Sequence, residues 1–185
     1  MAEAKVTQVK GSMLAGFVKA IKADTTGNLA AAITDEARDL IQQRILTANW
    51  YPFAPYKSCF QAVCQINARS NPEIMRQFGR KAGEETMTSV YRTVFSKNTV
   101  EGAMDSFRVI GSTVYDSLTI RSEISEDNKL RISFHDFDPD FAEWYFVGLG
   151  WMERTLELVL GKDVKSEIVE RSWEGAPATV FEMRW

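Results

Sequence analysis

The chain has 185 residues, of which 45% are hydrophobic and 25% are charged, so neither a disordered nor a fibrous class is expected. This length fits one domain, residues 1–185, around a single hydrophobic core. Positive and negative residues are mixed along the sequence and leave a net charge of −3. A nucleic-acid partner is therefore not expected, because there is no basic stripe to neutralise phosphates.

The sequence also argues against a membrane or secreted protein. No stretch approaches the roughly 20 apolar residues of a membrane span, and the first residues lack the apolar core of a signal peptide. Cys59 and Cys64 are predicted to be buried free thiols, since on one helix they would point about 140° apart. A cytoplasmic location is the resulting prediction.

The first part of the chain, about 8–111, is predicted to be helical, with about five helices. Apolar spacing predicts a first helix over roughly 8–24, which ends at Gly27-Asn28, and a second helix with Thr34 as its N-cap. Trp50-Tyr51-Pro52 is expected to separate this second helix from a third one that ends near Asn67.

Two further helices complete this part. Asn71-Pro72 is a strong start signal, in which a capping side chain precedes a proline at the first helical position. The long helix that follows has an apolar stripe, and Thr99 is predicted to cap a fifth helix that ends near Gly111. The stripe consists of Met75, Phe78, Ala82, Val90, Tyr91 and Val94.

The later part, about 113–185, is predicted to be rich in strands. Alternating apolar and polar residues on both sides of Glu126-Asp127-Asn128 predict a hairpin, and a second hairpin is expected over about 163–172 and 178–185. Between them, 140–160 returns to helical spacing, with Gly161 as C-cap. The predicted class is α+β: a helical half followed by an antiparallel four-stranded sheet with one intervening helix.

Two pairs of glycines inside predicted helices are candidates for close packing. Gly79 and Gly83, four residues apart, indicate a face against which another backbone or a ligand packs closely, and helix–helix contact is favoured. Gly148 and Gly150 are interpreted as a thin patch where the late helix crosses the sheet.

His135 is the only histidine, which excludes a multi-histidine metal site. Asp136, Asp138 and Asp140 follow it in an order that partly resembles a calcium loop but lacks the required glycine and the final glutamate. A strand end and a helix cap, with Pro139 opening the next helix, is favoured. An enzyme would most plausibly depend on His135 with Asp136, but no convincing catalytic set is present, so no enzymatic activity is predicted.

Several local strings resemble the superfamily that joins heme-nitric-oxide-binding (H-NOX) domains, 4-vinyl-reductase-type small-molecule-binding domains and Bet3-like subunits of TRAPP tethering complexes. Trp50-Tyr51-Pro52 also resembles an uncharacterised deltaproteobacterial family of myxobacterial type. The strings are Val9-Lys10-Gly11-Ser12, Ile74-Met75-Arg76-Gln77-Phe78-Gly79-Arg80, Trp144-Tyr145-Phe146-Val147-Gly148-Leu149 and the terminal hairpin.

The resemblance also shows where this chain departs from its heme- and zinc-containing members. The place of their proximal histidine falls near Ile110, and their propionate-binding Y-x-S-x-R motif falls on the three aspartates, which would repel carboxylates. Arg171 and Thr179 stand at the two cysteine positions of the zinc motif. The resemblance therefore implies a cofactor-free member, without heme or metal.

The leading hypothesis is a regulatory or sensory module that holds a small apolar ligand between the helical part and the sheet. A filled core is the competing interpretation of the same residues. The candidate pocket residues are Phe78, Met104, Phe107, Ile110, Tyr145, Met152 and Phe181.

The alternative hypothesis is a protein-interaction or scaffolding subunit, which binds a protein partner or a second copy through aromatics near the ends of elements. The interface candidates are Trp50, Tyr51, Phe53, Trp173 and Trp185.

Overall fold

The computed structural model describes residues 6–88, 90–95, 97–125 and 128–185. In chain order its strands and α-helices are β1 (Gln8–Lys10), α1 (Gly11–Ala23), α2 (Asn28–Ala32), α3 (Asp35–Gln42), β2 (Trp50–Pro52), α4 (Phe53–Asn67), α5 (Pro72–Thr88), α6 (Val100–Val114), β3 (Thr119–Ser125), β4 (Lys129–His135), α7 (Ala142–Leu160), β5 (Lys165–Glu170) and β6 (Thr179–Arg184). Short 3-10 helices span Val90–Phe95 and Ser172–Glu174.

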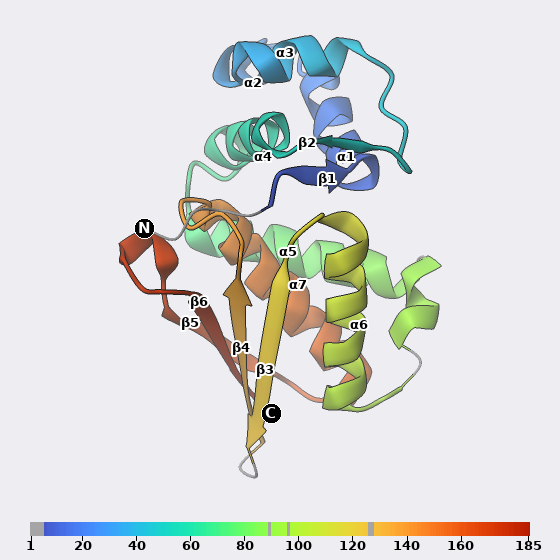
Figure 1. Cartoon of the computed structure of the whole chain (residues 1–185), viewed down its shortest axis with the longest axis vertical. Coiled ribbons are helices and arrows are strands. Elements are labelled where there is room, and N and C mark those ends of the chain that lie inside the picture. Colours follow the sequence, from blue (N-terminus) through green and yellow to red (C-terminus); the bar gives the residue numbers. More distant parts are fainter. Residues whose placement is uncertain (1–5, 89, 96, 126–127) are drawn as a thin grey trace.

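The elements form two stacked parts (Figure 1). The upper part contains α1 to α4 and the small antiparallel sheet of β1 and β2. The lower part contains an antiparallel four-stranded sheet in the order β3-β4-β6-β5, with α6 and α7 beside it and α5 packed against α7. Buried apolar residues from both parts belong to one cluster.

The predicted α+β class is confirmed, with helices first, then four antiparallel strands and one helix between the hairpins. Both predicted hairpins form, β3 with β4 and β5 with β6, and β4 joins them by pairing with β6. Glu126 and Asp127 of the first predicted turn lie outside the described residues. Asn128, which follows them, has a positive φ of 55°.

The predicted helix starts rest on capping hydrogen bonds. Thr34 Oγ1 accepts from the backbone N–H of Ala37 at 3.3 Å, and Thr99 Oγ1 accepts from that of Gly102 at 3.1 Å. The Asn71 amide oxygen accepts from the N–H of Glu73 at 2.9 Å. These side chains satisfy backbone donors that have no partner inside the helix.

The start of the chain differs from the prediction. Gln8–Lys10 is a strand and not the first turn of a helix, because it pairs with Trp50–Pro52, a segment that had been expected only to end a helix. After Gly27, which has a φ of 75°, the chain forms the additional short helix α2. Pairing across some forty residues decided β1 and β2, and local spacing does not reveal it.

Two helix boundaries were also wrong. The long helix α5 ends at Thr88, and the side chains of Val90 and Tyr91 lie outside the described residues. Helix α7 begins at Ala142, so Pro139 does not open it; instead Asp138 accepts a hydrogen bond from the N–H of Asp140 at 2.9 Å, within the turn before the helix.

Helices α5 and α7 approach each other at glycines. A Cβ on Gly79 would lie 1.9 Å from the Val147 carbonyl oxygen, and one on Gly150 would lie 2.0 Å from that of Arg76. Helix–helix contact, the favoured interpretation of Gly79, is therefore confirmed. The interpretation of Gly150 was wrong, because this glycine faces α5 and not the sheet.

Charged residues flank the same contact. The Glu153 side chain, 5% exposed, accepts hydrogen bonds from Arg76 at 2.9 Å (Nε), from Arg80 and from Ser166. Glu157 accepts from Arg80 Nη2 at 2.9 Å and from Arg154 Nη1 at 2.8 Å. The two carboxylates thus join α7 to α5 and to β5.

We expect the free energy of unfolding to depend on pH partly through the hydrogen bonds that Glu157 accepts from Arg80 and Arg154. Burial by itself would raise the pKa of Glu157, but the hydrogen bonds and charges of Arg80 and Arg154 outweigh it and bring the pKa below its ordinary 4.5. A carboxyl whose folded pKa is lowered stabilises the fold fully above its unfolded pKa, and this contribution disappears as the pH falls through the folded pKa. In urea unfolding between pH 7 and pH 3, Glu157→Gln should therefore lose less stability than the wild type; parallel curves would contradict this.

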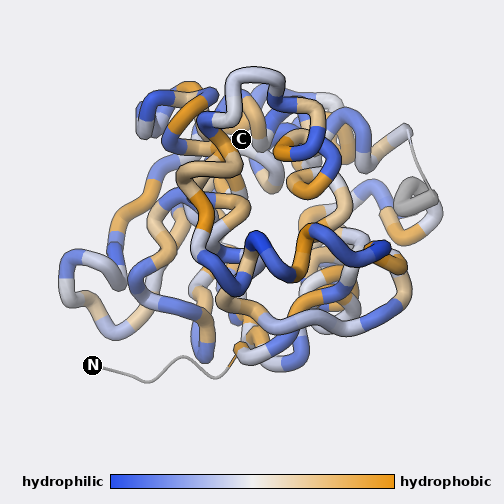
Figure 2. The backbone as a smooth tube through the Cα atoms, turned by 90° about the horizontal axis from the view of Figure 1, so that it is seen from above, coloured by the Kyte–Doolittle hydropathy of each residue, from blue (hydrophilic) through white to orange (hydrophobic). Residues whose placement is uncertain are grey.

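Hydrophilic and hydrophobic stretches alternate along the chain, as Figure 2 shows. Among the described residues, no helix is both long and apolar enough to cross a membrane.

Candidate functional site

An apolar cavity of about 250 Å³ lies between α6 and α7. Helix α5 and the start of β3 close two of its sides, and one side chain each from α1 and α4 covers it from the upper part of the molecule. Its lining consists of Met13, Phe60, Ala82, Thr86, Phe107, Ile110, Gly111, Val114, Tyr115, Leu118, Ile120, Trp144, Val147, Gly148, Trp151 and Met152.

The polar groups of the lining are engaged within the protein. Trp151 Nε1 donates to Thr86 Oγ1 at 2.9 Å, and this hydroxyl donates to the Ala82 carbonyl oxygen at 2.8 Å. Trp144 Nε1 donates to the Tyr115 hydroxyl at 2.6 Å. The surface offered to a ligand is consequently almost entirely hydrocarbon and aromatic.

Tyr115 also meets a second tyrosine. Its hydroxyl lies 3.1 Å from that of Tyr56. Tyr56 packs in an aromatic cluster with Phe53, Phe60 and Phe141. Burial raises the pKa of Tyr115 to about 12 and holds that of Tyr56 well above its ordinary value. Both phenols therefore stay protonated at neutral pH. We call Tyr56, Tyr115 and Trp144 the hydroxyl cluster.

The position of Tyr115 is fixed from three sides. It is the C-cap of α6, its backbone N–H donates to the Gly111 carbonyl oxygen at 3.0 Å, and it pairs with Val9 in an isolated antiparallel bridge. The hydroxyl cluster thus links both parts of the fold at the wall of the cavity.

The structure brings three of the seven candidate pocket residues to this cavity: Phe107, Ile110 and Met152. Phe78 lies elsewhere on α5, where its side chain is 37% exposed. The buried face of α5 is formed by Met75, Gly79 and Gly83. Because the glycines allow α7 to approach, the larger Phe78 is left outside.

The remaining candidates fill the core near the sheet. Met104, Tyr145 and Phe181 are buried but are not part of the cavity lining. The Tyr145 ring packs against Trp173, with centroids 5.3 Å apart, and edge-on to Phe134. These three residues lie in a filled core, as the interpretation that competes with a ligand pocket expects.

Sequence reasoning missed the tryptophans and Tyr115. A signal for part of the lining was present, because Trp144, Gly148 and Trp151 stand at i, i+4 and i+7 and so share one helix face. Tyr115 had no such signal, since it follows the end of a helix and reaches the cavity only through the pairing of distant segments.

The interface candidates occupy different environments. Trp50 is 39% exposed, with the Lys10 ammonium 4.1 Å from its ring centroid. Tyr51 and Phe53 are buried; the Tyr51 hydroxyl accepts from the backbone N–H of Leu46 at 2.8 Å, and Phe53 joins the aromatic cluster. Trp173 and Trp185 are half-buried. The five residues thus do not form one exposed aromatic patch.

The acid and histidine candidates are held by structural contacts. His135 Nε2 lies 2.9 Å from Ser133 Oγ, and no hydrogen bond to its Nδ1 is formed by the described residues. Asp136 accepts from Thr119 Oγ1 at 3.0 Å, while Asp138 pairs with Lys57 at 2.6 Å. A histidine without an orienting carboxylate is not a catalytic triad.

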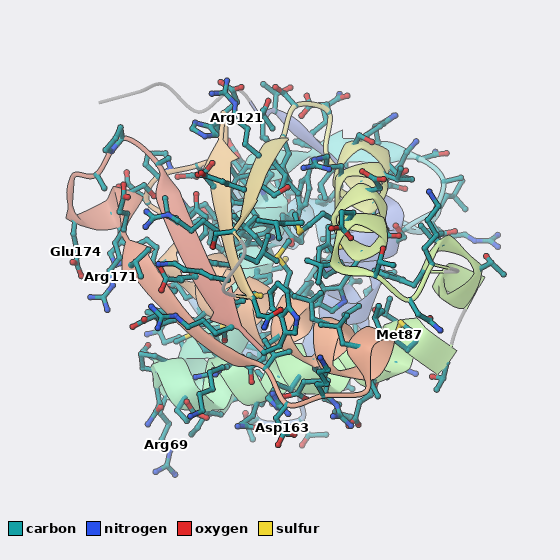
Figure 3. All side chains as sticks on the ribbon, turned by 90° about the horizontal axis from the view of Figure 1, so that it is seen from below. Arg69, Met87, Arg121, Asp163, Arg171 and Glu174 are labelled. Carbon is teal, nitrogen blue, oxygen red and sulfur yellow. The ribbon has the colours of Figure 1, made fainter. Side chains whose placement is uncertain are left out.

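Potential metal ligands are dispersed. Within the described ranges, no three or more His, Cys, Asp or Glu residues are grouped so that they could hold a metal ion. Arg171 and Thr179, at the positions of the zinc cysteines, belong to the last hairpin. Arg171 pairs with Glu174 at 2.9 Å, and both point outward at the edge of the molecule (Figure 3). Thr179 Oγ1 lies 2.8 Å from Ser172 Oγ.

The arrangement of elements matches that of solved structures. An H-NOX protein from S. oneidensis in the Fe(II)NO ligation state gives a TM-score of 0.64 at 14% identity, with 95% of this chain and 98% of that chain covered. The chain has the H-NOX fold. A T. tengcongensis H-NOX mutant gives 0.60 at 16% identity, and a K. algicida H-NOX mutant gives 0.64 at 12% identity, each with 95% of both chains covered. No family model and no curated protein matches the sequence.

The H-NOX fold raises the question of a heme, and the cavity residues do not fit one. Proteins hold heme iron through histidine, cysteine thiolate, methionine or tyrosine. The lining contains no histidine or cysteine, and Ile110 stands where the resemblance places the proximal histidine. Methionine ligates heme iron together with histidine, so Met13 and Met152 of the lining lack the partner ligand. Tyr115 is a neutral phenol committed to the hydroxyl cluster. Burial raises the pKa of the Cys59 thiol to about 11 and that of Cys64 to about 12, so neither is a thiolate at neutral pH.

The size and charge of the cavity also argue against a heme. Among the described residues, no Lys or Arg lines the cavity to hold propionates. Its 250 Å³ is below the roughly 300–1,000 Å³ of pockets for drug-sized ligands, and a porphyrin is larger than most of these. The cavity suits a smaller and uncharged molecule.

Proposed function

We propose that the chain is a sensory or regulatory module that binds one small apolar molecule, without a heme or metal, in the cavity between α6 and α7. The observation that carries the proposal is the cavity itself, about 250 Å³ with an almost wholly apolar lining. An engineered apolar cavity of about 150 Å³ is known to stay dry and to bind benzene, so this volume is adequate for a substituted ring.

The position of the cavity supports the same function. Ile110 lines it, and the resemblance places the proximal histidine of heme-binding members at this residue. By this resemblance, the cavity corresponds to the region where those members hold their cofactor. Its apolar lining, without a suitable iron ligand among the described residues, favours an organic molecule. We further propose, from the same resemblance, a kinship with the 4-vinyl-reductase-type and Bet3-like branches of the superfamily, which hold no heme.

Native mass spectrometry of protein purified from its own host, followed by thermal unfolding with a panel of monocyclic aromatic compounds, tests the proposal. A ligand at 100 times its Kd adds about 2.7 kcal/mol to the free energy of unfolding, which raises the Tm by about 5–10 °C for a chain of this size. If no molecule is retained and no compound raises the Tm, the proposal is overturned.

A matched pair of variants locates the binding. Ile110→Trp places a larger ring in the cavity and should abolish the rise in Tm. Val109→Trp is the control, because the neighbouring Val109 is 54% exposed and is not part of the cavity lining. Equal ligand responses of the two variants would show that the ligand binds elsewhere.

The alternative of a protein-interaction surface would have to rest on Trp50, which at 39% exposure is the one exposed residue among the five aromatic candidates, all of which the structure describes. One exposed ring beside a lysine is weaker support than a formed cavity, because binding energy at interfaces concentrates in clustered and desolvated anchors.

A further inference from the structure

The hydroxyl cluster contains more hydrogen-bond donors than acceptor contacts. Trp144 contributes one N–H, which can only donate, and Tyr56 and Tyr115 contribute one O–H each. Two hydrogen bonds join the three groups: Trp144 to Tyr115, and one between the two hydroxyls. These contacts use two of the three hydrogens.

The third hydrogen has no acceptor among the described residues. Both tyrosines are almost completely buried, and the described residues offer neither hydroxyl an acceptor other than the hydroxyl of the other tyrosine. A buried donor without an acceptor destabilises a protein, which is why such donors are rare. One hydroxyl hydrogen is thus available to an external acceptor.

The cavity is the place where that acceptor can lie. Tyr115 lines it, whereas Tyr56 does not. When Tyr56 donates to Tyr115, the Tyr115 oxygen accepts from both neighbours, and its own hydrogen is free to point toward the cavity. A buried water usually makes two to four hydrogen bonds, and this lining has few polar groups that are not already engaged. The cavity therefore favours an acceptor on an organic ligand over a water molecule.

We infer that the cavity selects a neutral ring compound with one hydrogen-bond acceptor, such as an aryl ketone or aldehyde, whose carbonyl oxygen accepts from the Tyr115 hydroxyl. A charged ligand is disfavoured because none of the described lining residues carries a charge. This inference rests on the proposed function and specifies the ligand class of the same cavity.

The test compares acetophenone with α-methylstyrene, which has the same shape but a CH₂ group in place of the carbonyl oxygen. Calorimetry gives the ratio of their Kd values for each protein. In Tyr115→Phe, the preference for acetophenone relative to α-methylstyrene should fall about five- to tenfold, the usual effect of one neutral hydrogen bond. In the control Tyr56→Phe, the preference should be retained, because Tyr115 keeps its hydrogen and Tyr56 is not part of the lining.

Infrared spectroscopy gives a second readout that needs no variant of Tyr115. The carbonyl band of ¹³C-labelled acetophenone bound to the wild type should lie at a lower wavenumber than in hexane. A band at the hexane position would overturn the inference.

The outcomes separate the two claims. If both probes bind and Tyr115→Phe does not change their ratio, the cavity is a ligand site but the hydrogen bond to Tyr115 is wrong. If neither probe nor any other compound of the aromatic panel binds, the proposed function and this inference are both overturned.

Discussion

Replacing Gly150 by alanine is expected to lower the free energy of unfolding by about 2–3 kcal/mol, and more if the two helices cannot separate. The added Cβ would lie 2.0 Å from the Arg76 carbonyl oxygen and 3.1 Å from its Cα, and both are backbone atoms that cannot rotate away. Helix α7 would have to move away from α5, and the neighbouring Gly79 contact with the Val147 carbonyl oxygen would loosen with it.

Gly148→Ala is the matched control in the same helix. The nearest atom to a Cβ at this position is a Trp144 ring carbon at 3.8 Å, an ordinary van der Waals contact. Because alanine has a higher helix propensity than glycine, this variant should be more stable than the wild type by up to about 1 kcal/mol. Urea unfolding of both variants measures the difference. Equal destabilisation would mean that close α5–α7 packing is not the cause.

Glu153→Ala is expected to cost about 3 kcal/mol, near the lower end of the range for breaking a buried ion pair. The substitution leaves two guanidinium groups, those of Arg76 and Arg80, without their shared carboxylate. Their side chains are 27% and 26% exposed, so water can replace part of the lost interaction. Ser166 of β5 loses its acceptor as well.

Glu84→Ala serves as the control for charge alone. Glu84 pairs with Arg154 at 2.9 Å across the same two helices, but its side chain is 56% exposed. Such surface pairs contribute about 0–1 kcal/mol. Thermal and urea unfolding should therefore separate the two variants clearly, and a Glu153→Ala protein as stable as Glu84→Ala would refute a central role for the buried carboxylate.

The parts of the candidate site that sequence reasoning missed are brought to the cavity by the packing of segments that are distant in sequence. The cavity lining contains residues from α1, α4, α5, α6, β3 and α7, and only those on a single helix face have a spacing that sequence can reveal. Phe107 and Ile110 were found in this way. Tyr115 and Met13 were not, because their relation to the cavity depends on how the upper part of the molecule packs on the lower part.

The exposure of three aromatic side chains was predicted wrongly from the sequence. Position near the end of an element suggested that Tyr51 and Phe53 are exposed, yet strand pairing of β2 with β1 and the aromatic cluster around Tyr56 bury both. Phe78 shows the opposite error, since its place in an apolar stripe suggested burial. In each case a neighbour distant in sequence decided the outcome.

The sequence by itself determined the α+β order, the capped starts of α3, α5 and α6, the two hairpins and the C-cap at Gly161, because capping, turn and periodicity signals act over a few residues. It also determined that no histidine stands near position 110. Only the tertiary structure decided that α5 and α7 pack through glycines, that a cavity remains between α6 and α7, and that Tyr115 of the hydroxyl cluster lines it. These features depend on the close packing of segments far apart in the chain, and local sequence patterns do not encode such packing.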